Sequence, residues 1–357
     1  MKIFANRYIL KEDLNHILFQ TEGLWEEIRN GRLFITGGTG FFGKWLLESF
    51  AQANKRFSLN VSIVVLTRDY ERFKKAYPHL AEDTSIEFCI GNVKNFKFPK
   101  GEFSHIIHAA ATSAVDTFNG EDPLSKFDNV VNGTRRVLDF AVKCGAKKLI
   151  LTGSGAVYGK HLNGIVNISE EYFGSQNFSD VKSSWGISKG TAEFLCACYS
   201  KKYGIETKIA RCFSFVGPYL QLDIHYAVGN FIKNGLDGGP IMVKGDGTPT
   251  RSYLYAADLT IWLWTILFKG KSCYPYNVGS EETVTVSQLA EIVAENFEII
   301  FNKNIKVEIQ NQPSFTKTAD NYVPSTKRAQ TELGLKQIIC LKDAINRTIK
   351  FYCGNNI

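Results

Sequence analysis

The sequence predicts an α/β fold with a Rossmann-like, doubly wound parallel sheet and a smaller C-terminal lobe. Residues 32–50 read as a strand, a glycine-rich loop and a helix. Apolar strand segments then alternate with helical segments, an order that places parallel strands in one sheet with helices on its faces. After Arg211 this regular alternation stops. We therefore expect a sheet domain over residues 31–212 and a second lobe built mainly from residues 213–357, with some segments returning to the sheet.

Residues 1–30 precede the first predicted strand and are expected to form an N-terminal helical extension. Leu14, Ile17 and Leu18 recur at helical spacing, and Trp25 adds a further apolar position. Because an amphipathic helix buries its apolar face, we expect this extension to dock on the sheet domain.

The sheet domain begins with the unit RLFITGGTGFFGKWLLESF. Its strand is Leu33–Ile35, and its helix has an apolar stripe that reaches Phe50. The loop between them contains Gly37, Gly40 and Gly43. Glycines in such a loop allow a tight turn, a close approach to a pyrophosphate, and close packing of helix on strand. The unit predicts a dinucleotide site at the helix N-terminus, with an ordinary glycine turn as the alternative.

A second apolar strand is expected at residues 61–67, and the residues at its end bear on which dinucleotide fits. An acidic residue there normally holds the ribose hydroxyls of the adenosine. Here the strand is followed by Arg68 and then Asp69. Because a guanidinium can pair with a 2′-phosphate, we favour NADP(H) over NAD(H). The alternative is that Arg68 is a solvated loop charge.

Three further strands are expected at residues 86–90, 105–111 and 147–154, with a long helix over residues 124–144. Their alternation with helices extends the parallel sheet. His108 lies at a strand end beside small residues. We expect it to be a structural histidine with satisfied hydrogen bonds rather than a catalytic one.

The composition limits the class of protein. The net charge of +7 is spread along the 357 residues, without the basic clusters typical of nucleic-acid binding. No apolar run reaches the roughly 18 residues needed to span a bilayer, and the N-terminus is a poor signal peptide. The eight cysteines have no metal-binding spacing. We expect a cytoplasmic protein with free thiols, no metal site, no membrane insertion and no nucleic-acid partner.

Several motifs together resemble the extended short-chain dehydrogenase/reductase family, in particular its nucleotide-sugar epimerases and dehydratases. In chain order they are TGGTGFFG, HAAA, LTGSGAVYG, SSWGISKGTAE, RCFSFVGPY, GDGTPTRSYLYAADL and YNVGS. The similarity runs through most of the chain and is more specific for the family than for one reaction. It implies a nucleoside-diphosphate sugar as substrate, bound in the C-terminal lobe.

The resemblance also implies two sets of binding residues. The cofactor-binding positions are Gly37, Thr39, Gly40, Phe41, Phe42, Gly43, Arg68, Asn92, Val93, Ala109, Ala110, Ala111, Lys189 and Phe213. The substrate-binding positions are Ser154, Ser214, Asn230 and Arg251. Arg251 matches the arginine that grips the substrate pyrophosphate, where a planar guanidinium suits phosphate oxygens. Asn92 stands where the family commonly has an aspartate, and Ser214 where it usually has an asparagine.

In this family a Ser or Thr, a Tyr and a Lys meet at the nicotinamide, and the matching residues are Ser154, Trp185 and Lys189. Trp185 cannot replace a tyrosine base, because an indole N–H only donates and does not titrate in the working range. Proton transfer could have moved to Lys189, Ser154, a water or the substrate. Alternatively, the protein binds its ligands but turns over poorly, or the tryptophan is engineered. A last alternative is that the alignment of this helix is out of register and Trp185 is merely a core residue.

The residues after Ser154 narrow the range of possible reactions. Sugar 4,6-dehydratases usually have acidic residues there, whereas this chain has Gly155 and Ala156. We predict an NAD(P)-dependent epimerase that oxidises the sugar, with C4 favoured, to a transient keto-sugar. A dehydratase or dehydrogenase of the same family is the alternative enzyme. An inactive, cofactor-bound family member is the non-enzymatic alternative.

Family members commonly dimerise by packing two helices of each subunit into a four-helix bundle. The matching segments are residues 124–144 and 183–202, and FLCACY adds an apolar face to the second. The resemblance therefore predicts a homodimer.

Overall fold

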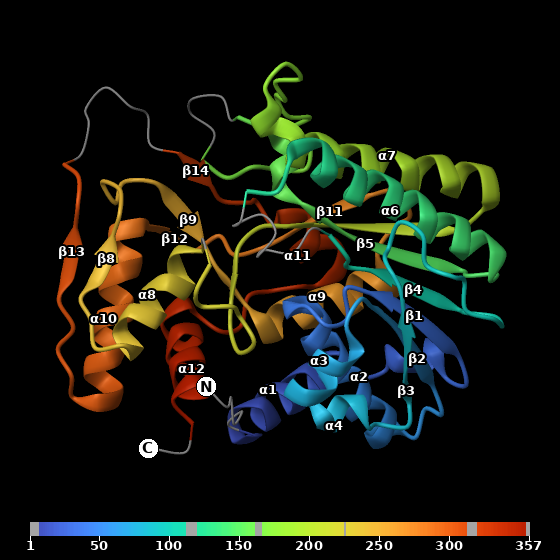
Figure 1. The fold of residues 1–357 in the computed structure, drawn as a ribbon, viewed down its shortest axis with the longest axis horizontal. Coiled ribbons are helices and arrows are strands. Elements are labelled where there is room, and N and C mark those ends of the chain that lie inside the picture. Colours follow the sequence, from blue (N-terminus) through green and yellow to red (C-terminus); the bar gives the residue numbers. More distant parts are fainter. Residues whose placement is uncertain (1–6, 112–119, 161–165, 225, 313–319, 355–357) are drawn as a thin grey trace.

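The computed structural model describes residues 7–111, 120–160, 166–224, 226–312 and 320–354 (Figure 1). In this part of the chain the main sheet has seven strands in the order β11-β6-β5-β4-β1-β2-β3, and all its neighbours pair in parallel. The strands are β1 (Arg32–Thr36), β2 (Ser62–Thr67), β3 (Ile86–Ile90), β4 (His105–His108), β5 (Lys148–Ser154), β6 (Glu206–Cys212) and β11 (Pro275–Val278). The predicted fold class is confirmed, and β11 is a segment that returns to the sheet from the second half.

Helices cover both faces of this sheet, because successive strand side chains point to opposite faces. In β1, Leu33 and Ile35 pack into one hydrophobic cluster, whereas Phe34 packs into another. The helices of the first cluster include α1 (Arg7–Gln20), α2 (Phe41–Phe57) and α9 (Ala256–Lys269). Those of the second are α6 (Pro123–Lys143) and α7 (Ser184–Tyr203), which lie side by side in Figure 1.

The N-terminal extension packs against the sheet domain. It forms α1 and the short helix η1 (Trp25–Ile28), and Leu14, Ile17, Leu18 and Trp25 are all buried. The ring of Trp25 lies 4.7 Å from that of Trp264 on α9. The extension is therefore part of the hydrophobic core.

The remaining elements of the first half are short. They are α3 (Tyr70–Ala76), α4 (Pro78–Ala81), η2 (Gly155–Tyr158) and η3 (Val181–Ser183). In the second half, two-residue strands β7 (Phe215–Val216) and β10 (Leu254–Tyr255) pair in parallel beside the main sheet. They connect the sheet domain to the smaller lobe.

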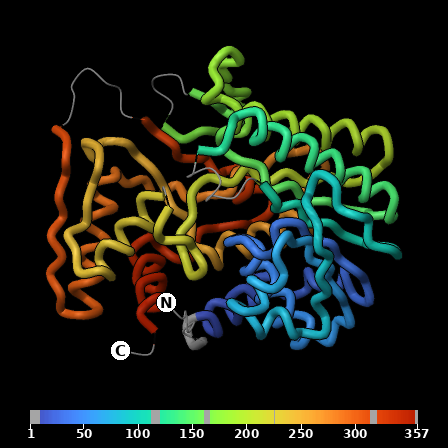
Figure 2. Tube along the Cα trace, viewed as in Figure 1, coloured from blue at the N-terminus to red at the C-terminus, as the bar shows by residue number. Residues whose placement is uncertain are grey.

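The smaller lobe lies at the left in Figures 1 and 2, away from the main sheet. Its helices are α8 (Ala227–Leu236) and α10 (Val286–Phe301), and the chain ends in α11 (Lys327–Leu333) and α12 (Leu341–Cys353). Its strands are β8 (Ile241–Val243), β9 (Thr250–Ser252), β12 (Thr283–Thr285), β13 (Val307–Ile309) and β14 (Asn321–Tyr322). They form the sheets β12-β9-β14 and β13-β8.

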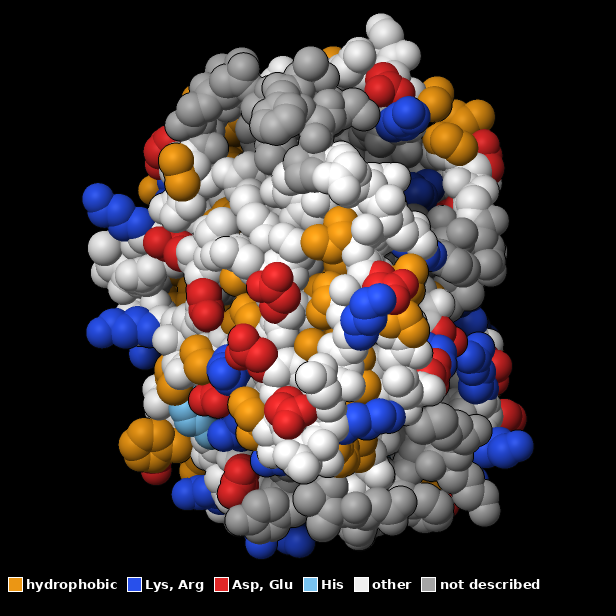
Figure 3. Space-filling view, turned by 90° about the vertical axis from the view of Figure 1, so that its left-hand side faces the viewer, with side chains coloured by type: hydrophobic (Ala, Val, Ile, Leu, Met, Phe, Trp, Pro, Cys, Tyr) orange, Lys and Arg blue, Asp and Glu red, His pale blue; other side chains and the backbone are white. Residues whose placement is uncertain are grey.

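On the face seen in Figure 3, basic and acidic side chains are intermixed. Among the residues described, no helix is both long and apolar enough to cross a membrane. The same residues contain no group of His, Cys, Asp and Glu arranged to hold a metal ion. All eight cysteines lie in the described ranges, where they are free thiols.

Candidate active site

Several predicted site residues lie at the carboxyl ends of β1, β4 and β5, which are neighbours in the sheet. Ligands of open parallel sheets bind outside the carboxyl ends of the strands. β1 leads into the glycine loop, β4 into Ala109 and Ala110, and β5 ends at Ser154. One edge of the sheet therefore holds the glycine loop and Ser154 together.

At two glycines of the loop the packing leaves no room for a side chain. Gly37 has a φ of +74°, and a Cβ there would lie 2.5 Å from the carbonyl carbon and oxygen of Ala109. A Cβ on Gly43 would lie 2.3 Å from the carbonyl oxygen of Gly37. Gly40 is the N-cap of α2 and has no side-chain capping bond. This helix N-terminus, with its unpaired N–H groups, fits the pyrophosphate of a dinucleotide.

The other predicted cofactor positions have varied surroundings. Thr39, Phe41, Phe42 and Ala111 are half-buried, and Phe213 is buried. Ala110 N–H donates to Thr36 Oγ1 over 3.2 Å. In the turn after β3, Asn92 Oδ1 accepts from Lys94 N–H, and Val93 packs against Gly133 of α6.

The end of β2 presents Arg68 and Asp69 to solvent. Asp69 is the N-cap of α3 and accepts a hydrogen bond of 2.9 Å from Arg72 N–H. Its carboxylate is thereby engaged in starting a helix.

Ser154 and Trp185 are in direct contact. The indole Nε1 of Trp185 donates to Ser154 Oγ over 3.3 Å, and Ala156 N–H donates to the same oxygen over 3.2 Å. Trp185 lies in the first turn of α7, which packs against β5 and η2. The side chain of Trp185 therefore contacts the residue that ends β5.

Lys189 lies one helical turn after Trp185, on the same face of α7. Its Nζ donates to the carbonyl oxygen of Thr152 over 2.8 Å and lies 5.0 Å from the Trp185 ring centroid. Burial lowers the pKa of Lys189 to about 8, although Cys212 and Glu193 act in the opposite direction. A buried ammonium of this kind supplies positive charge at the strand end.

A tyrosine that no motif marks packs on Phe213, near this cluster. Tyr322 lies on the two-residue strand β14. Its ring lies 4.7 Å from that of Phe213, and its register partner on β9 is Arg251. A two-residue strand has no periodicity, so the sequence contained no signal for this contact.

Arg251 is the predicted substrate residue that the structure places beside this cluster. Its guanidinium lies 5.9 Å from the Tyr322 ring centroid and forms an ion pair of 2.7 Å with Asp320. Ser214 precedes β7, and its carbonyl accepts from Leu254 N–H. Asn230 is half-buried on α8, in the smaller lobe.

His108 is structural, as expected. Its Nδ1 hydrogen-bonds Thr36 Oγ1 at 2.7 Å and its Nε2 hydrogen-bonds Thr134 Oγ1 at 3.0 Å. Complete burial lowers its pKa to about 3, so the imidazole is neutral at physiological pH. Both ring nitrogens are occupied in linking β1, β4 and α6.

Comparison with known proteins shows relatives over nearly the whole chain. The chain is 29% identical over 322 residues to UDP-glucuronic acid decarboxylase 3 of Arabidopsis thaliana, covering 88% of this chain and 87% of the relative. It is 26% identical over 325 residues to UDP-glucuronic acid decarboxylase 1 of Xenopus tropicalis, covering 90% and 72%.

Solved structures share the fold at lower identity. The UDP-N-acetylglucosamine 4-epimerase of Methanobrevibacter ruminantium has a TM-score of 0.76 and 16% identity, with 91% of this chain and 99% of that chain covered. The dTDP-glucose 4,6-dehydratase DesIV of Streptomyces venezuelae, solved with NAD bound, has a TM-score of 0.74 and 23% identity, covering 91% and 97%.

The profile of the NAD-dependent epimerase/dehydratase family matches residues 33–279, which is more than half of the chain. The matched range contains the glycine loop, Ser154, Trp185, Lys189 and Arg251. The chain therefore belongs to the NAD-dependent epimerase/dehydratase family, as its motifs predicted.

Proposed function

We propose that this protein oxidises the C4 hydroxyl of a nucleoside-diphosphate sugar to a transient keto-sugar and then reduces it from the other face, as an NAD(P)-dependent epimerase. The observation that supports this most directly is the contact of Ser154 with Trp185 at the end of β5, one turn from Lys189. In the family, these positions surround the sugar hydroxyl and the nicotinamide. When bound, the oxidised nicotinamide supplies the hydride acceptor.

The roles of the three residues follow from their chemistry. The Ser154 hydroxyl can hydrogen-bond the sugar hydroxyl, and Lys189 can hold the nicotinamide ribose and stabilise negative oxygen. Trp185 Nε1 orients Ser154 by donating to it. A positioned acid–base group typically contributes roughly 10²- to 10⁴-fold in rate, so an active enzyme needs a proton acceptor other than this indole.

Decarboxylation of a UDP-uronic acid is the second candidate, because the curated relatives named above are UDP-glucuronic acid decarboxylases. This reaction also starts with oxidation at C4. The resulting 4-keto acid is a β-keto acid, so its C5–C6 bond breaks with release of CO₂ and the electrons pass into the carbonyl. It requires no acidic residue next to Ser154.

A standard 4,6-dehydratase fits less well. Such an enzyme needs acidic groups to remove the C5 proton and expel the C6 hydroxyl. Ser154 is followed by Gly155 and Ala156, and a Cβ on Gly155 would already lie 2.7 Å from Cζ of the Phe213 ring. There is no space at residue 155 for a carboxylate without moving that ring.

For the cofactor, we propose NADP(H), with NAD(H) as the alternative. Arg68 is exposed at the end of β2, where the adenosine ribose binds in folds of this type. Asp69, the acid that follows Arg68 in the sequence, is the N-cap of α3. This arrangement favours a cofactor whose ribose bears a 2′-phosphate.

For the substrate, we propose that Arg251 binds the pyrophosphate, with Ser214 and Asn230 contributing polar contacts to the nucleotide sugar. Arg251 is on β9 at the edge of the smaller lobe, beside Tyr322 and Phe213. Its exposed partner Asp320 can be exchanged for phosphate oxygens, because a surface ion pair contributes only about 0–1 kcal/mol.

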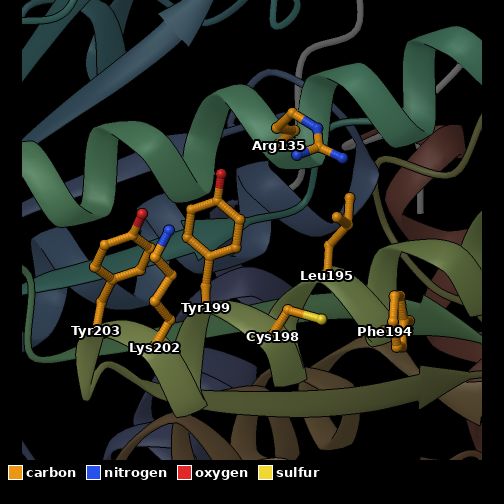
Figure 4. A pocket seen from close by; sticks show the side chains of 7 residues that line it. All are labelled: Arg135, Phe194, Leu195, Cys198, Tyr199, Lys202 and Tyr203. Carbon is orange, nitrogen blue, oxygen red and sulfur yellow. The ribbon is translucent and has the colours of Figure 1, made fainter.

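We also propose a homodimer formed through α6 and α7. A shallow pocket on these helices is lined by Arg135, Phe194, Leu195, Cys198, Tyr199, Lys202 and Tyr203 (Figure 4). Phe194 is 67% exposed, and Leu124 and Val142 on α6 are exposed too. Phe194→Glu should yield a monomer by light scattering, whereas Glu at Phe173, an exposed phenylalanine outside these helices, should not. A wild-type monomer at micromolar concentration would contradict the proposal.

The proposed activity is tested by incubating the protein and either NAD⁺ or NADP⁺ with UDP-glucose, UDP-N-acetylglucosamine, UDP-glucuronic acid and dTDP-glucose in turn. Product analysis by NMR distinguishes a C4 epimer from a pentose nucleotide formed with CO₂. We expect turnover of at least one sugar without net consumption of the dinucleotide. Binding of the cofactor without turnover of any sugar would favour the inactive family member.

The free thiols are consistent with a reducing compartment, and we propose the cytoplasm as the location.

A further inference from the structure

The contact of Ser154 with Trp185 joins two separate elements. Ser154 is the N-cap of η2, the short helix that follows β5, and Trp185 lies in the first turn of α7. Their hydrogen bond of 3.3 Å is longer than the usual N–H···O range of about 2.7–3.2 Å. One such bond fixes two elements only weakly, so their relative position must depend on other contacts between η2 and α7.

A glutamine side chain occupies the junction of these two elements. Gln176 comes from the segment between η2 and α7 and is half-buried. Its Nε2 donates to the carbonyl oxygen of Ala156 over 2.6 Å and to that of Val157 over 3.0 Å. Because carbonyl oxygens only accept, the amide nitrogen and not the amide oxygen must face them. The two protons of one amide group therefore hold two neighbouring carbonyls of η2.

The carbonyls of η2 depend on partners outside the helix. Carbonyl groups at the end of a helix have no partner within it, and η2 has only four residues. A buried carbonyl without a partner is costly, so such groups are nearly always paired. By donating to Ala156 and Val157, Gln176 supplies partners that the short helix cannot provide for itself.

The same glutamine side chain is in contact with α7. Gly186, the residue after Trp185, is buried, and a Cβ there would lie 2.4 Å from Nε2 of Gln176. The same Cβ would lie 2.4 Å from the carbonyl oxygen of Ala156. Gln176 is therefore packed between η2, which begins after Ser154, and the turn of α7 that bears Trp185.

The backbone before Gln176 is bound to the end of η2. Ser175 N–H donates to the carbonyl oxygen of Tyr158 over 2.8 Å, and Gly159 and Ser175 form a parallel bridge. Tyr158 is fully buried, and its O–H donates to Asn277 Oδ1 on β11 over 2.7 Å. The segment that carries Gln176 is thus attached through η2 to the main sheet, and its side chain has a fixed origin.

We propose that Gln176 is a positioning residue that fixes Ser154 and Trp185 relative to each other. It acts on Ser154 through the carbonyls of η2, and on Trp185 through Gly186. A misplacement of about 1 Å can reduce the rate of an enzyme by roughly 10²-fold, so turnover should depend on this junction. The effect on turnover rests on the proposed function, whereas the effect on the position of the indole does not.

The test uses Gln176→Met, which keeps the length of the side chain and removes both donors. We expect kcat to fall by about tenfold or more, which is part of the scale of a misplaced reacting group. The calorimetric affinity for the dinucleotide should not change. Phe178→Gln alters an exposed side chain two residues further along the segment and should behave like the wild type. Wild-type kcat in Gln176→Met would overturn the proposal, and so would a loss of cofactor affinity as large as the loss of rate.

A second readout requires no turnover. The chain has five tryptophans, so the emission of Trp185 is obtained as the difference between a protein and its Trp185→Phe counterpart. In Gln176→Met we expect acrylamide to quench this emission more strongly than in the wild type, because the indole is no longer held against Ser154. Unchanged quenching would overturn the proposal. If the wild type converts no sugar nucleotide, the proposed function fails, and quenching alone decides the role of Gln176.

Gly186→Ala disturbs the same junction from the side of α7. Its Cβ would displace the Gln176 amide and the Ala156 carbonyl, whereas at Gly190, one turn later, a Cβ meets nothing within 4 Å. Gly190→Ala is therefore the matched control. Because substitutions of residues in contact are usually not additive, Gln176→Met combined with Gly186→Ala should change kcat and quenching little more than the more damaging single variant. Fully additive effects would show that the two residues act separately and would overturn the proposal.

Discussion

The indole of Trp185 donates a hydrogen bond of 3.3 Å to the hydroxyl of Ser154, at the point where members of this family bring together a tyrosine and a serine or threonine. The contact preserves the position of the aromatic ring at the end of β5 and removes the titrating hydroxyl. Lys189 lies beneath the same ring, with its Nζ 5.0 Å from the centroid. We propose that the tryptophan positions its neighbours and leaves proton transfer to another group.

Trp185→Phe tests this positioning role. Removing the indole N–H deletes one neutral hydrogen bond to Ser154, which is worth roughly 0.5–1.5 kcal/mol. We expect kcat/KM to fall by about 2- to 10-fold, with the limbs of the pH–rate profile unmoved because indole does not titrate in this range. A loss of roughly 10²-fold with a displaced limb would instead show that the indole takes part in proton transfer.

Trp185→Tyr tests, in the same assay, whether a phenol at residue 185 changes turnover. Because Ser154 Oγ already accepts a hydrogen bond from the indole, we expect turnover to stay level or to decrease in a pocket shaped around indole. An increase of roughly 10²-fold would mean that the tyrosine was simply missing from otherwise intact machinery.

The lowered pKa of Lys189 makes a prediction about pH. Burial brings this pKa to about 8, and kcat/KM reports groups of the free enzyme. If Lys189 acts as a cation, kcat/KM falls as pH rises through about 8, because the ammonium then loses its proton. Lys189→Met should lower the rate at neutral pH and remove this limb. A wild-type rate that rises through the same pH would assign the neutral amine as a base.

Gly37→Ala tests the glycine loop as the cofactor site. The positive φ of Gly37 costs an alanine about 1–3 kcal/mol, and its Cβ would overlap the backbone of Ala109, which cannot move as a flexible side chain can. We expect a lower melting temperature and loss of dinucleotide binding in calorimetry. Gly190→Ala on α7, where a Cβ meets nothing within 4 Å, is the matched control and should bind normally. Normal affinity in Gly37→Ala would place the cofactor elsewhere.

Arg68→Asp tests the preference for NADP(H). The change removes the cation proposed to pair with the 2′-phosphate and supplies a carboxylate that can accept from ribose hydroxyls. Calorimetric titration with both dinucleotides should show the ratio of affinities moving towards NAD(H). Tighter binding of NAD(H) by the wild type would show that Arg68 does not select a phosphate.

Much of the fold followed from local patterns. Leu33, Phe34 and Ile35 form a buried strand, and the adjacent glycines are required by contacts of 2.3–2.5 Å that leave no room for a Cβ. The docking of the extension followed from the spacing of Leu14 and Ile17. Such features depend on neighbours in the sequence, so periodicity and motif spacing were sufficient to predict them.

The site was only partly predictable, because its remaining contacts are between distant segments. The pairing of β14 with β9 brings Tyr322 next to Arg251, and neither the two-residue strand nor its register has a sequence signature. The role of Asp69 as a helix cap could not be predicted either, because the sequence after the second strand is also compatible with a free carboxylate. Contacts of this kind are determined by the packing of the smaller lobe on the sheet domain.

The most direct test of the account follows deuterium from C4 of the sugar nucleotide that the protein converts. If the enzyme removes hydride from C4 and returns it, the C4-deuterated substrate reacts more slowly, with a primary isotope effect, and NMR finds the deuterium still on C4 of the product. Inverted configuration at C4 then identifies an epimerase, and release of CO₂ with retained configuration identifies a decarboxylase. Turnover without an isotope effect, or with loss of C4 deuterium to solvent, would contradict oxidation and re-reduction at that carbon.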